Sequence, residues 1–337
     1  MATRFKNWAG KTVFITGATG FLGSWLIKEL IKNNANVVAL VQKVSSEFLF
    51  YTDKLDKKCT VIFGSFLDFD LLQRTINEFN VNTVFHLGAQ TIVGTANKSP
   101  LSTFETNIKG TWNILENCRL SPWVKKIIIA SSDRAYGEHK SFSYTEETPM
   151  QGRYPYDVSK SCVDLLSQSY YHTYNLPVCV TRCVNLFGEG DQHLNRIIPG
   201  TITSVLSGQQ PVIRSNGLLT RDYMYIKDAV NAYLTLAENM DDKKIIGQCF
   251  NFSTGNPLSV LEIVEKILVL MKTNIKPIIE NKASNEATER YISSKKAHSL
   301  LNWKTKYKID EGLQKTIEWY KSFFSTKKPT KRLEQRI

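Results

Sequence analysis

The first half of the chain alternates short apolar stretches with segments of helical periodicity. Short runs of apolar and β-branched residues predict strands, and apolar residues that recur every three or four positions predict helices. In residues 21–32, for example, Leu22, Trp25, Leu26, Glu29 and Leu30 form the buried stripe of a predicted helix. Regular β-α alternation is typical of a doubly wound parallel sheet, so the pattern predicts an α/β, Rossmann-type fold. The predicted strands are 11–16, 37–41, 60–63, 83–87, 126–130 and 178–182, and the predicted helices are 21–32, 68–78, 100–118 and 156–174.

The alternation ends after residue 185. Helices are expected at 196–206 and 226–239, and a strand at 248–253 is expected to return to the sheet. From residue 259 the pattern predicts a helix, a short strand at 276–280 and small helices. We therefore predict a nucleotide-binding, Rossmann-type domain and a smaller, partly interleaved C-terminal domain. Their expected bounds are 1–184 with 225–255 for the first domain, 185–224 with 256–325 for the second, and 326–337 for a basic tail.

Composition narrows the class of protein. Hydrophobic residues make up 42% of the chain and charged residues 22%, as in ordinary globular proteins. No apolar run is long enough to cross a bilayer, and the first eleven residues are polar and basic, so a cytoplasmic protein without a membrane partner is expected. The six cysteines show no metal-ligand spacing, which favours packed, reduced thiols and no metal site.

The formal net charge of +12 indicates an anionic partner, either a nucleic acid or a small molecule that carries a diphosphate. Much of the excess lies in the basic tail, and the chain has no nucleic-acid-binding motif. Nucleic acid is therefore not expected as a partner.

A glycine-rich turn joins the first predicted strand to the first helix. It reads Gly17-Ala18-Thr19-Gly20-Phe21-Leu22-Gly23. In such a turn one glycine permits the tight bend, another lets the backbone approach a pyrophosphate, and a third lets helix and strand pack closely. The helix N-terminus offers free N–H groups to the phosphates. The turn therefore predicts dinucleotide binding.

The residues that end the second strand bear on the choice of cofactor. An acidic side chain there would bind the ribose 2′-hydroxyl of NAD, whereas basic or polar side chains admit the 2′-phosphate of NADP. The stretch from Val41 through Gln42 and Lys43 to Ser45 contains no carboxylate. This favours NADP, with the alternative that Lys43 is an exposed lysine without a role.

Tyr156 and Lys160 lie four residues apart in a predicted helix and so share one face. A nearby ammonium favours the phenolate, which lowers the pKa of a tyrosine and suits it to take a proton from a sugar hydroxyl. Ser132 follows the strand at 126–130 and is expected to hydrogen-bond the same hydroxyl.

Together these motifs resemble those of the extended short-chain dehydrogenase/reductases. The resemblance covers about residues 10 to 305. Within that family the chain most resembles the nucleotide-sugar 4,6-dehydratases, with the CDP-glucose branch nearest and the GDP-mannose branch next. The matching stretches are Thr16–Trp25, His86–Gln90, Ser132–Tyr136 and Asn285–Ala287.

The resemblance implies a set of binding residues and a homodimer. Two helices are expected to form the dimer interface, through Val163, Leu166, Tyr170, Ile108, Trp112 and Leu115. The implied cofactor-binding residues are Gly17, Thr19, Gly20, Phe21, Leu22, Gly23, Gln42, Lys43, Ser65, Phe66, Leu87, Gly88, Ala89, Gln90, Asn107 and Lys160. The implied substrate-binding residues are Thr91, Val93, Asn185, Asn195, Arg196, Arg221 and Arg290. Asn185 is expected to bind the sugar diphosphate, with Asn195 and Arg196 close by, and Arg221 and Arg290 are expected to neutralise its two phosphates.

The reaction implied by the resemblance is a closed redox cycle on tightly bound NAD or NADP. Tyr156 takes the proton of the sugar 4-hydroxyl as the C4 hydride leaves, and the 4-ketone acidifies C5. Asp133 then protonates the departing 6-hydroxyl, and the hydride returns to C6, which gives an NDP-4-keto-6-deoxyhexose. A helix or loop cap is the alternative role for Asp133.

Three positions depart from the pattern of the resembled family. Arg134 stands where that family has an acid/base residue, yet arginine keeps its proton. Arg134 is then expected to orient the substrate, or to stabilise an enolate while another group or a water takes the proton. Otherwise the reaction is a C4 epimerisation, a 4-oxidoreduction or a dehydration with a different final product. A non-catalytic, NAD(P)-sensing protein is a further alternative.

The other two departures lie at cofactor-binding positions. Ser65 replaces an adenine-binding aspartate, for which Asp68 is no obvious substitute, and Gly88 replaces an alanine.

Overall fold

The computed structural model describes residues 8–139, 143–282 and 291–325. The chain divides into two compact units. The first unit contains residues 1–183, 229–252 and 292–304, and the second contains residues 184–228, 253–291 and 305–337. The sequence analysis placed residues 292–304 with the substrate domain, whereas Trp303 packs edge-on against Phe252 of the first unit.

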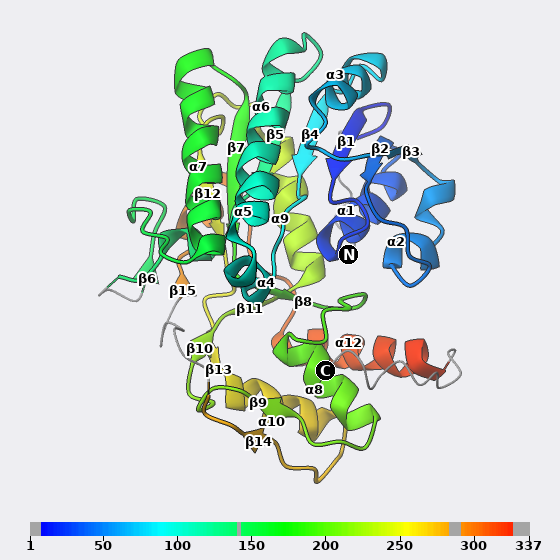
Figure 1. The fold of residues 1–337 in the computed structure, drawn as a ribbon, viewed down its shortest axis with the longest axis vertical. Helices are drawn as coiled ribbons and strands as arrows, with labels where there is room; N and C mark the ends of the chain where they lie inside the picture. The colour runs from blue at the N-terminus through cyan, green and yellow to red at the C-terminus, as the bar shows by residue number, and fades with distance from the viewer. Residues whose placement is uncertain (1–7, 140–142, 283–290, 326–337) are drawn as a thin grey trace. The chain divides into compact units, whose positions relative to one another are not determined.

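One parallel sheet forms the centre of the first unit, and the predicted α/β, Rossmann-type fold is confirmed (Figure 1). Its strand order is β12-β7-β5-β4-β1-β2-β3, and every neighbouring pair is parallel. The order reverses between β1 and β4, which is where ligands bind in doubly wound sheets. The strands are β1 (Thr12–Thr16), β2 (Asn36–Val41), β3 (Thr60–Phe63), β4 (Thr83–His86), β5 (Lys126–Ala130), β7 (Val178–Cys183) and β12 (Cys249–Phe252).

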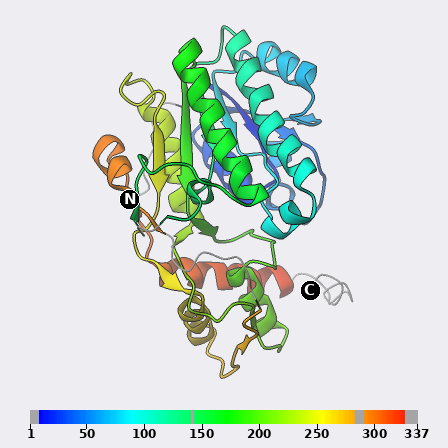
Figure 2. The same ribbon diagram turned by 60° about the vertical axis from the view of Figure 1, so that its left-hand side comes forward.

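Helices cover both faces of this sheet (Figures 1 and 2). Successive strand residues point to opposite faces. Phe14 therefore joins the core beneath α3, α6 and α7, while its neighbours Val13 and Ile15 are buried on the opposite face of the sheet. The helical segments are α1 (Phe21–Lys32), α2 (Leu49–Thr52), η1 (Leu55–Lys57), α3 (Phe69–Glu78), α4 (Val93–Lys98), α5 (Pro100–Phe104), α6 (Gly110–Leu120), η3 (Asp133–Tyr136), α7 (Pro155–Tyr174), α9 (Ile226–Asn239) and α11 (Lys295–Leu301).

The buried face of α1 differs from the expected stripe. Leu26 and Leu30 are buried as predicted, but Leu22 and Trp25 are half-buried, and Gly23, Ser24 and Ile27 are buried instead. Ser24 faces the glycine turn because its hydroxyl donates to the carbonyl oxygens of Ala18 and Gly20. The helix is thus rotated towards the turn, and the predicted stripe was wrong in part.

The predicted helix at 100–118 is interrupted by a π-helical turn. This turn, η2 (Glu105–Lys109), lies between α5 and α6. Such turns are rare in proteins as a whole, and many of those that occur lie at functional sites. Here the turn carries the buried Asn107.

A buried ion pair joins β7 to α7. Arg182 and Asp164 are both nearly inaccessible, and the guanidinium Nε lies 2.8 Å from the Asp164 carboxylate. Arg182 also donates from Nη1 to the Tyr136 hydroxyl in η3, at 2.7 Å. Because a buried charge is costly unless paired, this network fixes η3 against α7.

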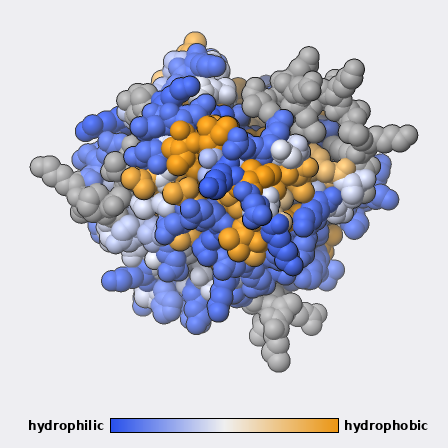
Figure 3. All heavy atoms as spheres, turned by 90° about the horizontal axis from the view of Figure 1, so that it is seen from below, coloured by the Kyte–Doolittle hydropathy of each residue, from blue (hydrophilic) through white to orange (hydrophobic). Residues whose placement is uncertain are grey.

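The second unit consists of helices and two-stranded pairs. Ser259 and Glu262 form a capping box that starts α10, and α10 packs against α8 and α12. Figure 3 shows hydrophobic residues grouped among hydrophilic ones on the face of the molecule seen from below. The elements are α8 (Ile197–Leu206), α10 (Val260–Leu270) and α12 (Ile309–Ser325), with the pairs β8 (Asn185–Phe187) and β11 (Tyr223–Tyr225), β9 (Val212–Ile213) and β14 (Ile278–Ile279), and β10 (Thr220–Arg221) and β13 (Leu258–Ser259). Two further short strands are β6 (Ser143–Tyr144), which belongs to the first unit, and β15 (Tyr291–Ile292), where the chain passes from the second unit to the first.

In the part of the chain that the structure describes, no helix combines the length and the apolar character needed to cross a membrane.

Candidate active site

The glycine turn is too crowded for side chains at two positions. Gly17 has φ +70°, and a Cβ there would lie 2.8 Å from the backbone nitrogen of Gly88. A Cβ on Gly23 would lie 2.1 Å from the carbonyl oxygen of Gly17. Gly20 is the N-cap of α1 and offers no side chain of its own. The turn is therefore a bare cradle at a helix N-terminus, which fits the pyrophosphate of a dinucleotide.

The loops that follow β1 and β4 meet at this cradle. Thr16 at the end of β1 accepts a hydrogen bond from the Gly88 N–H at 3.1 Å. The structure thus brings Leu87 and Gly88 against Gly17, and Ala89 and Gln90 follow them in the same loop. Thr19 lies in the glycine turn, and Phe21 and Leu22 begin α1. Gln42 and Lys43 are exposed just beyond β2. That these two residues favour NADP over NAD stays a prediction.

The ring of Phe66 accounts for the glycine at position 88. A Cβ on Gly88 would lie 2.6 Å from a ring carbon of Phe66, and one on Gly110 would lie 2.4 Å from another. Ser65 accepts from the Leu67 N–H, and Asp68 caps α3 by accepting from the Leu71 N–H. Asp68 therefore stabilises the start of α3.

A buried chain of hydrogen bonds leads away from the glycine turn through His86. The Thr111 hydroxyl donates to the carbonyl oxygen of Asn107, at 2.6 Å, so it can only accept from His86 Nε2, 3.2 Å away. His86 Nδ1 must then accept from the Thr16 hydroxyl, at 2.7 Å. Burial lowers the pKa of His86 to about 3, with a smaller effect of Lys160, which is consistent with this neutral tautomer.

Asn107 connects this chain to the helix that carries Tyr156. Its amide Oδ1 accepts from the Gln90 N–H at 2.7 Å, and its Nδ2 donates to the Gln90 carbonyl at 3.0 Å. Nδ2 also donates to Ser159 Oγ at 2.9 Å, and Ser159 donates to the Tyr156 carbonyl. From the sequence, Asn107 was predicted only as a cofactor-binding residue. No sequence pattern indicated that Thr111 and Ser159 would hydrogen-bond within this network.

The five predicted catalytic residues lie on two adjacent segments of the first unit, η3 and α7. Tyr156 and Lys160 are buried in α7, and Ser132, Asp133 and Arg134 lie at the start of η3. Lys160 Nζ donates to the Ala130 carbonyl at 2.7 Å, at the end of β5. Burial lowers the pKa of Lys160 to about 8, so the side chain still carries a charge at neutral pH.

Ser132, and not Asp133, caps η3. Ser132 Oγ accepts from the Arg134 N–H at 3.2 Å and donates to Asp133 Oδ1 at 3.0 Å. The Asp133 carboxylate is half-buried beside the serine. Nearby, burial raises the pKa of the Cys183 thiol to about 12, which keeps it protonated at neutral pH.

The second unit holds four of the predicted substrate residues. Asn185 Nδ2 donates to the Asp222 carbonyl, Arg221 donates to the Thr220 carbonyl, and Arg196 pairs with Asp191 at 3.0 Å. Asn195 accepts from Arg214, a residue that the sequence analysis missed. Thr91 is exposed in the first unit, where Val93 begins α4. Arg290 and the 285–287 stretch lie outside the described residues.

Among the described residues, no group of three or more His, Cys, Asp or Glu side chains is placed to hold a metal ion.

Residues 14–316 match the family model of GDP-mannose 4,6 dehydratase. The CDP-glucose 4,6-dehydratase of Salmonella typhimurium is 28% identical, and the alignment covers 94% of this chain and 93% of that protein. The dTDP-D-glucose 4,6-dehydratase of Bos taurus is 30% identical, with 96% and 93% covered. These similarities confirm the resemblance seen in the motifs.

Solved structures are similar over nearly the whole chain. The dTDP-glucose 4,6-dehydratase of Bacillus anthracis, in complex with NAD, has a TM-score of 0.82 and 26% identity, with 93% of this chain and 97% of that one covered. The UDP-glucose 4-epimerase of Thermotoga maritima, with UDP-glucose, has a TM-score of 0.85 and 25% identity, with 93% and 99% covered.

The buried His86 predicts a pH dependence of stability. An unfolded histidine takes up a proton near pH 6.5, whereas the folded ring does so only near pH 3. Between these values the unfolded state binds one more proton, so the free energy of unfolding falls as the pH falls, by about 1.4 kcal/mol per pH unit. His86→Gln should lack this contribution in urea titrations between pH 4 and 6.5.

His172→Gln, which removes an exposed histidine of α7, is the matched control. An unchanged slope in His86→Gln would show that the ring is not held neutral.

Proposed function

Because this chain belongs to the GDP-mannose 4,6-dehydratase family, we propose that it is a nucleotide-sugar 4,6-dehydratase, a hydro-lyase that forms an NDP-4-keto-6-deoxyhexose. The observation that carries the proposal is the carboxylate of Asp133 beside Ser132 in η3, next to the helix of Tyr156 and Lys160. Loss of water needs an acid at the leaving oxygen, which a simple 4-epimerase does not require.

Each of these side chains has a distinct part in the proposed reaction. Tyr156 takes the proton of the 4-hydroxyl, and the charge on Lys160 favours the phenolate. Ser132 hydrogen-bonds the same hydroxyl. Once C4 is a ketone, C5 becomes acidic, and Asp133 donates a proton to the 6-hydroxyl as it leaves as water.

The cradle at Gly17, Gly20 and Gly23 would hold NAD or NADP, which supplies a reversible hydride acceptor when bound. Gln42 and Lys43, which replace an acidic residue after β2, favour NADP. We expect this cofactor to stay bound through the cycle, because the hydride that it takes from C4 returns to C6.

The proposed substrate is a nucleotide diphosphate hexose, with a CDP-hexose as the first candidate. Asn185, Asn195, Arg196, Arg221 and Arg290 would bind the diphosphate, since the planar guanidinium suits phosphate oxygens. We place the reaction in the cytoplasm, because all six cysteines are free thiols.

Arg134 is the observation that favours a second function. A residue that keeps its proton cannot take the C5 proton, and without that step the reaction becomes a 4-epimerisation or 4-oxidoreduction. A UDP-glucose 4-epimerase shares the fold over most of this chain. A non-catalytic NAD(P) sensor would have no use for Ser132, Tyr156 and Lys160 together.

Mass spectrometry separates these functions. Purified protein is incubated with CDP-, GDP-, UDP- and dTDP-hexoses in deuterated water. We expect one substrate to lose water and gain solvent deuterium at C5. An unchanged mass with inverted C4 would establish the epimerase instead, and no reaction with any sugar would support the sensor.

Tyr156→Phe should lower the rate by about 10²–10⁴-fold, because the phenyl ring cannot take the hydroxyl proton. Turnover is followed by product formation under saturating substrate. Tyr174→Phe, on an exposed part of the same helix, should leave the rate unchanged. Near-normal turnover of Tyr156→Phe would remove Tyr156 from this role.

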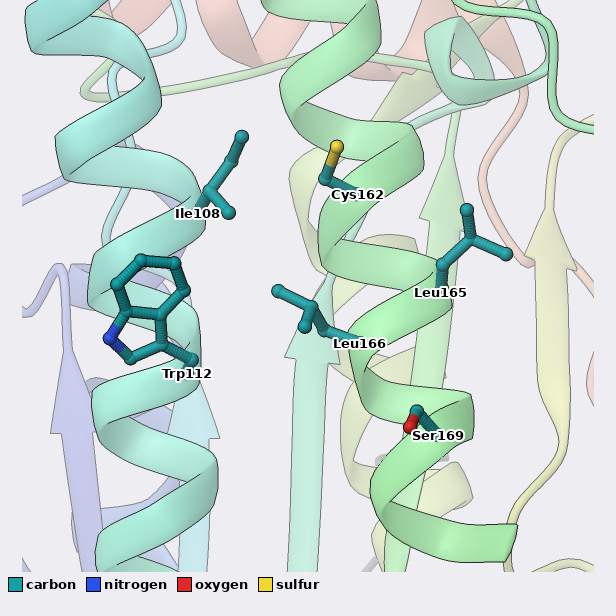
Figure 4. A pocket seen from close by; sticks show the side chains of 6 residues that line it. All are labelled: Ile108, Trp112, Cys162, Leu165, Leu166 and Ser169. Atoms are coloured by element: carbon teal, nitrogen blue, oxygen red, sulfur yellow. The ribbon is translucent and has the colours of Figure 1, made fainter.

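We also propose a homodimer through η2, α6 and α7. Side chains of these elements line an apolar cavity of about 400 Å³ (Figure 4). Trp112 is 43% exposed there and Leu165 is 57% exposed. Val163 and Leu115, which the sequence analysis placed in the interface, are instead buried in the core beneath these helices. The lining residues are Ile108, Trp112, Cys162, Leu165, Leu166 and Ser169.

Leu165→Glu should therefore convert a dimer to a monomer in light scattering, because it buries a charge in the interface. Val269→Glu, which places the same charge on an exposed position of α10 in the second unit, is the control. A monomeric wild-type protein at micromolar concentration would contradict the proposal.

A further inference from the structure

Arg134 stands at the position where the resembled family has an acid/base residue, next to Asp133 in the chain. Its residue type excludes proton transfer, because the guanidinium keeps its charge at every working pH. The side chain is 28% exposed and lies beside Asp133, the proposed acid. A fixed positive charge at this place suits the stabilisation of negative charge that develops during the reaction.

Asp157 directly follows Tyr156 in the first turn of α7, and its side chain is only 3% exposed. Arg134 Nη1 lies 3.4 Å from Asp157 Oδ1. A buried carboxylate is costly unless it is paired, so the pair constrains both side chains. Sequence patterns gave no role to Asp157.

The backbone around this pair leaves little freedom. A Cβ on Gly152 would lie 2.6 Å from the carbonyl carbon of Asp157, so only glycine fits against this turn. Ser161 Oγ donates to the carbonyl oxygens of both Ala135 and Asp157, at 2.8 and 3.1 Å. The start of α7 and η3 therefore hold Asp157 and Arg134 at a set separation.

We propose that Asp157 is a positioning residue, whose buried carboxylate holds the guanidinium of Arg134 where it stabilises the enolate of the 4-keto intermediate. This inference rests on the proposed dehydratase function. The C5–H bond breaks, its proton passes to a water molecule, and its electron pair forms the enolate with negative charge on the C4 oxygen. That pair then forms the C5–C6 double bond, while the 6-hydroxyl leaves as water with the proton of Asp133.

A comparison of two steps tests the proposal. Single turnovers are followed by reduced nicotinamide absorbance for C4 oxidation and by mass spectrometry in deuterated water for exchange at C5. Asp157→Asn keeps the shape of the side chain and removes its charge. It should slow C5 exchange and water loss by about 10²-fold, because the cation is no longer held in place, and leave C4 oxidation within about threefold.

Arg134→Gln and the double variant show whether Asp157 acts through Arg134. If it does, Asp157→Asn adds nothing to Arg134→Gln, whereas independent effects multiply. Arg134→Lys keeps a cation and should retain more C5 exchange than Arg134→Gln. Arg134 is partly exposed, so Arg134→Gln and Arg134→Lys are expected to fold. They test the role of the cation at C5 if Asp157→Asn fails to fold.

The proposal is overturned if Asp157→Asn slows both steps equally, if the two single effects multiply, or if Arg134→Gln exchanges C5 at the normal rate. If the wild-type protein oxidises and dehydrates its sugar while a variant gives one of these results, the inference fails and the proposed function stands. A wild-type protein that never oxidises C4 would remove the proposed function and the inference together.

Discussion

The side-chain amide of Asn107 is the constraint on which the geometry of the first unit depends. Both N–H groups of this buried amide donate, one to the Gln90 carbonyl after β4 and one to Ser159 in α7, and its oxygen accepts from the Gln90 N–H. A buried amide that is fully satisfied holds its partners, because breaking one bond strands a polar group. The loop expected to contact the cofactor and the helix of Tyr156 are therefore set by one residue, and the π-helical turn brings it there.

Much of the fold could be predicted because the strands of the parallel sheet are buried on both faces. Each strand therefore stands out in the sequence as a short run of apolar residues. The helix at 21–32 and the strand at 60–63 have the predicted bounds. Local periodicity carries no information about the π-helical turn inside residues 100–118. The rotation of α1 depends on hydrogen bonds from Ser24 to the glycine turn, which are also invisible to a pattern of apolar residues.

Tyr156, Lys160 and Ser132 could be predicted as catalytic residues, because they belong to a motif with a fixed spacing and a known chemistry. Contacts between distant segments lay beyond the sequence. The glycine at 88 follows from the ring of Phe66, twenty-two residues earlier, and the ion pair of Arg134 with Asp157 depends on η3 meeting α7. The capping role expected as the alternative for Asp133 belongs to Ser132, because Ser132 is the N-cap residue of η3 and accepts from the Arg134 N–H.

In the proposed reaction the sugar is oxidised at C4 and reduced at C6 within one turnover. This transfer can be followed with the preferred nucleotide hexose carrying deuterium in place of hydrogen at C4, by mass spectrometry and NMR of the product. We expect a 4-keto-6-deoxy product with that deuterium in its C6 methyl group. A product without deuterium at C6, or an isomer of unchanged mass that keeps deuterium at C4, would contradict it.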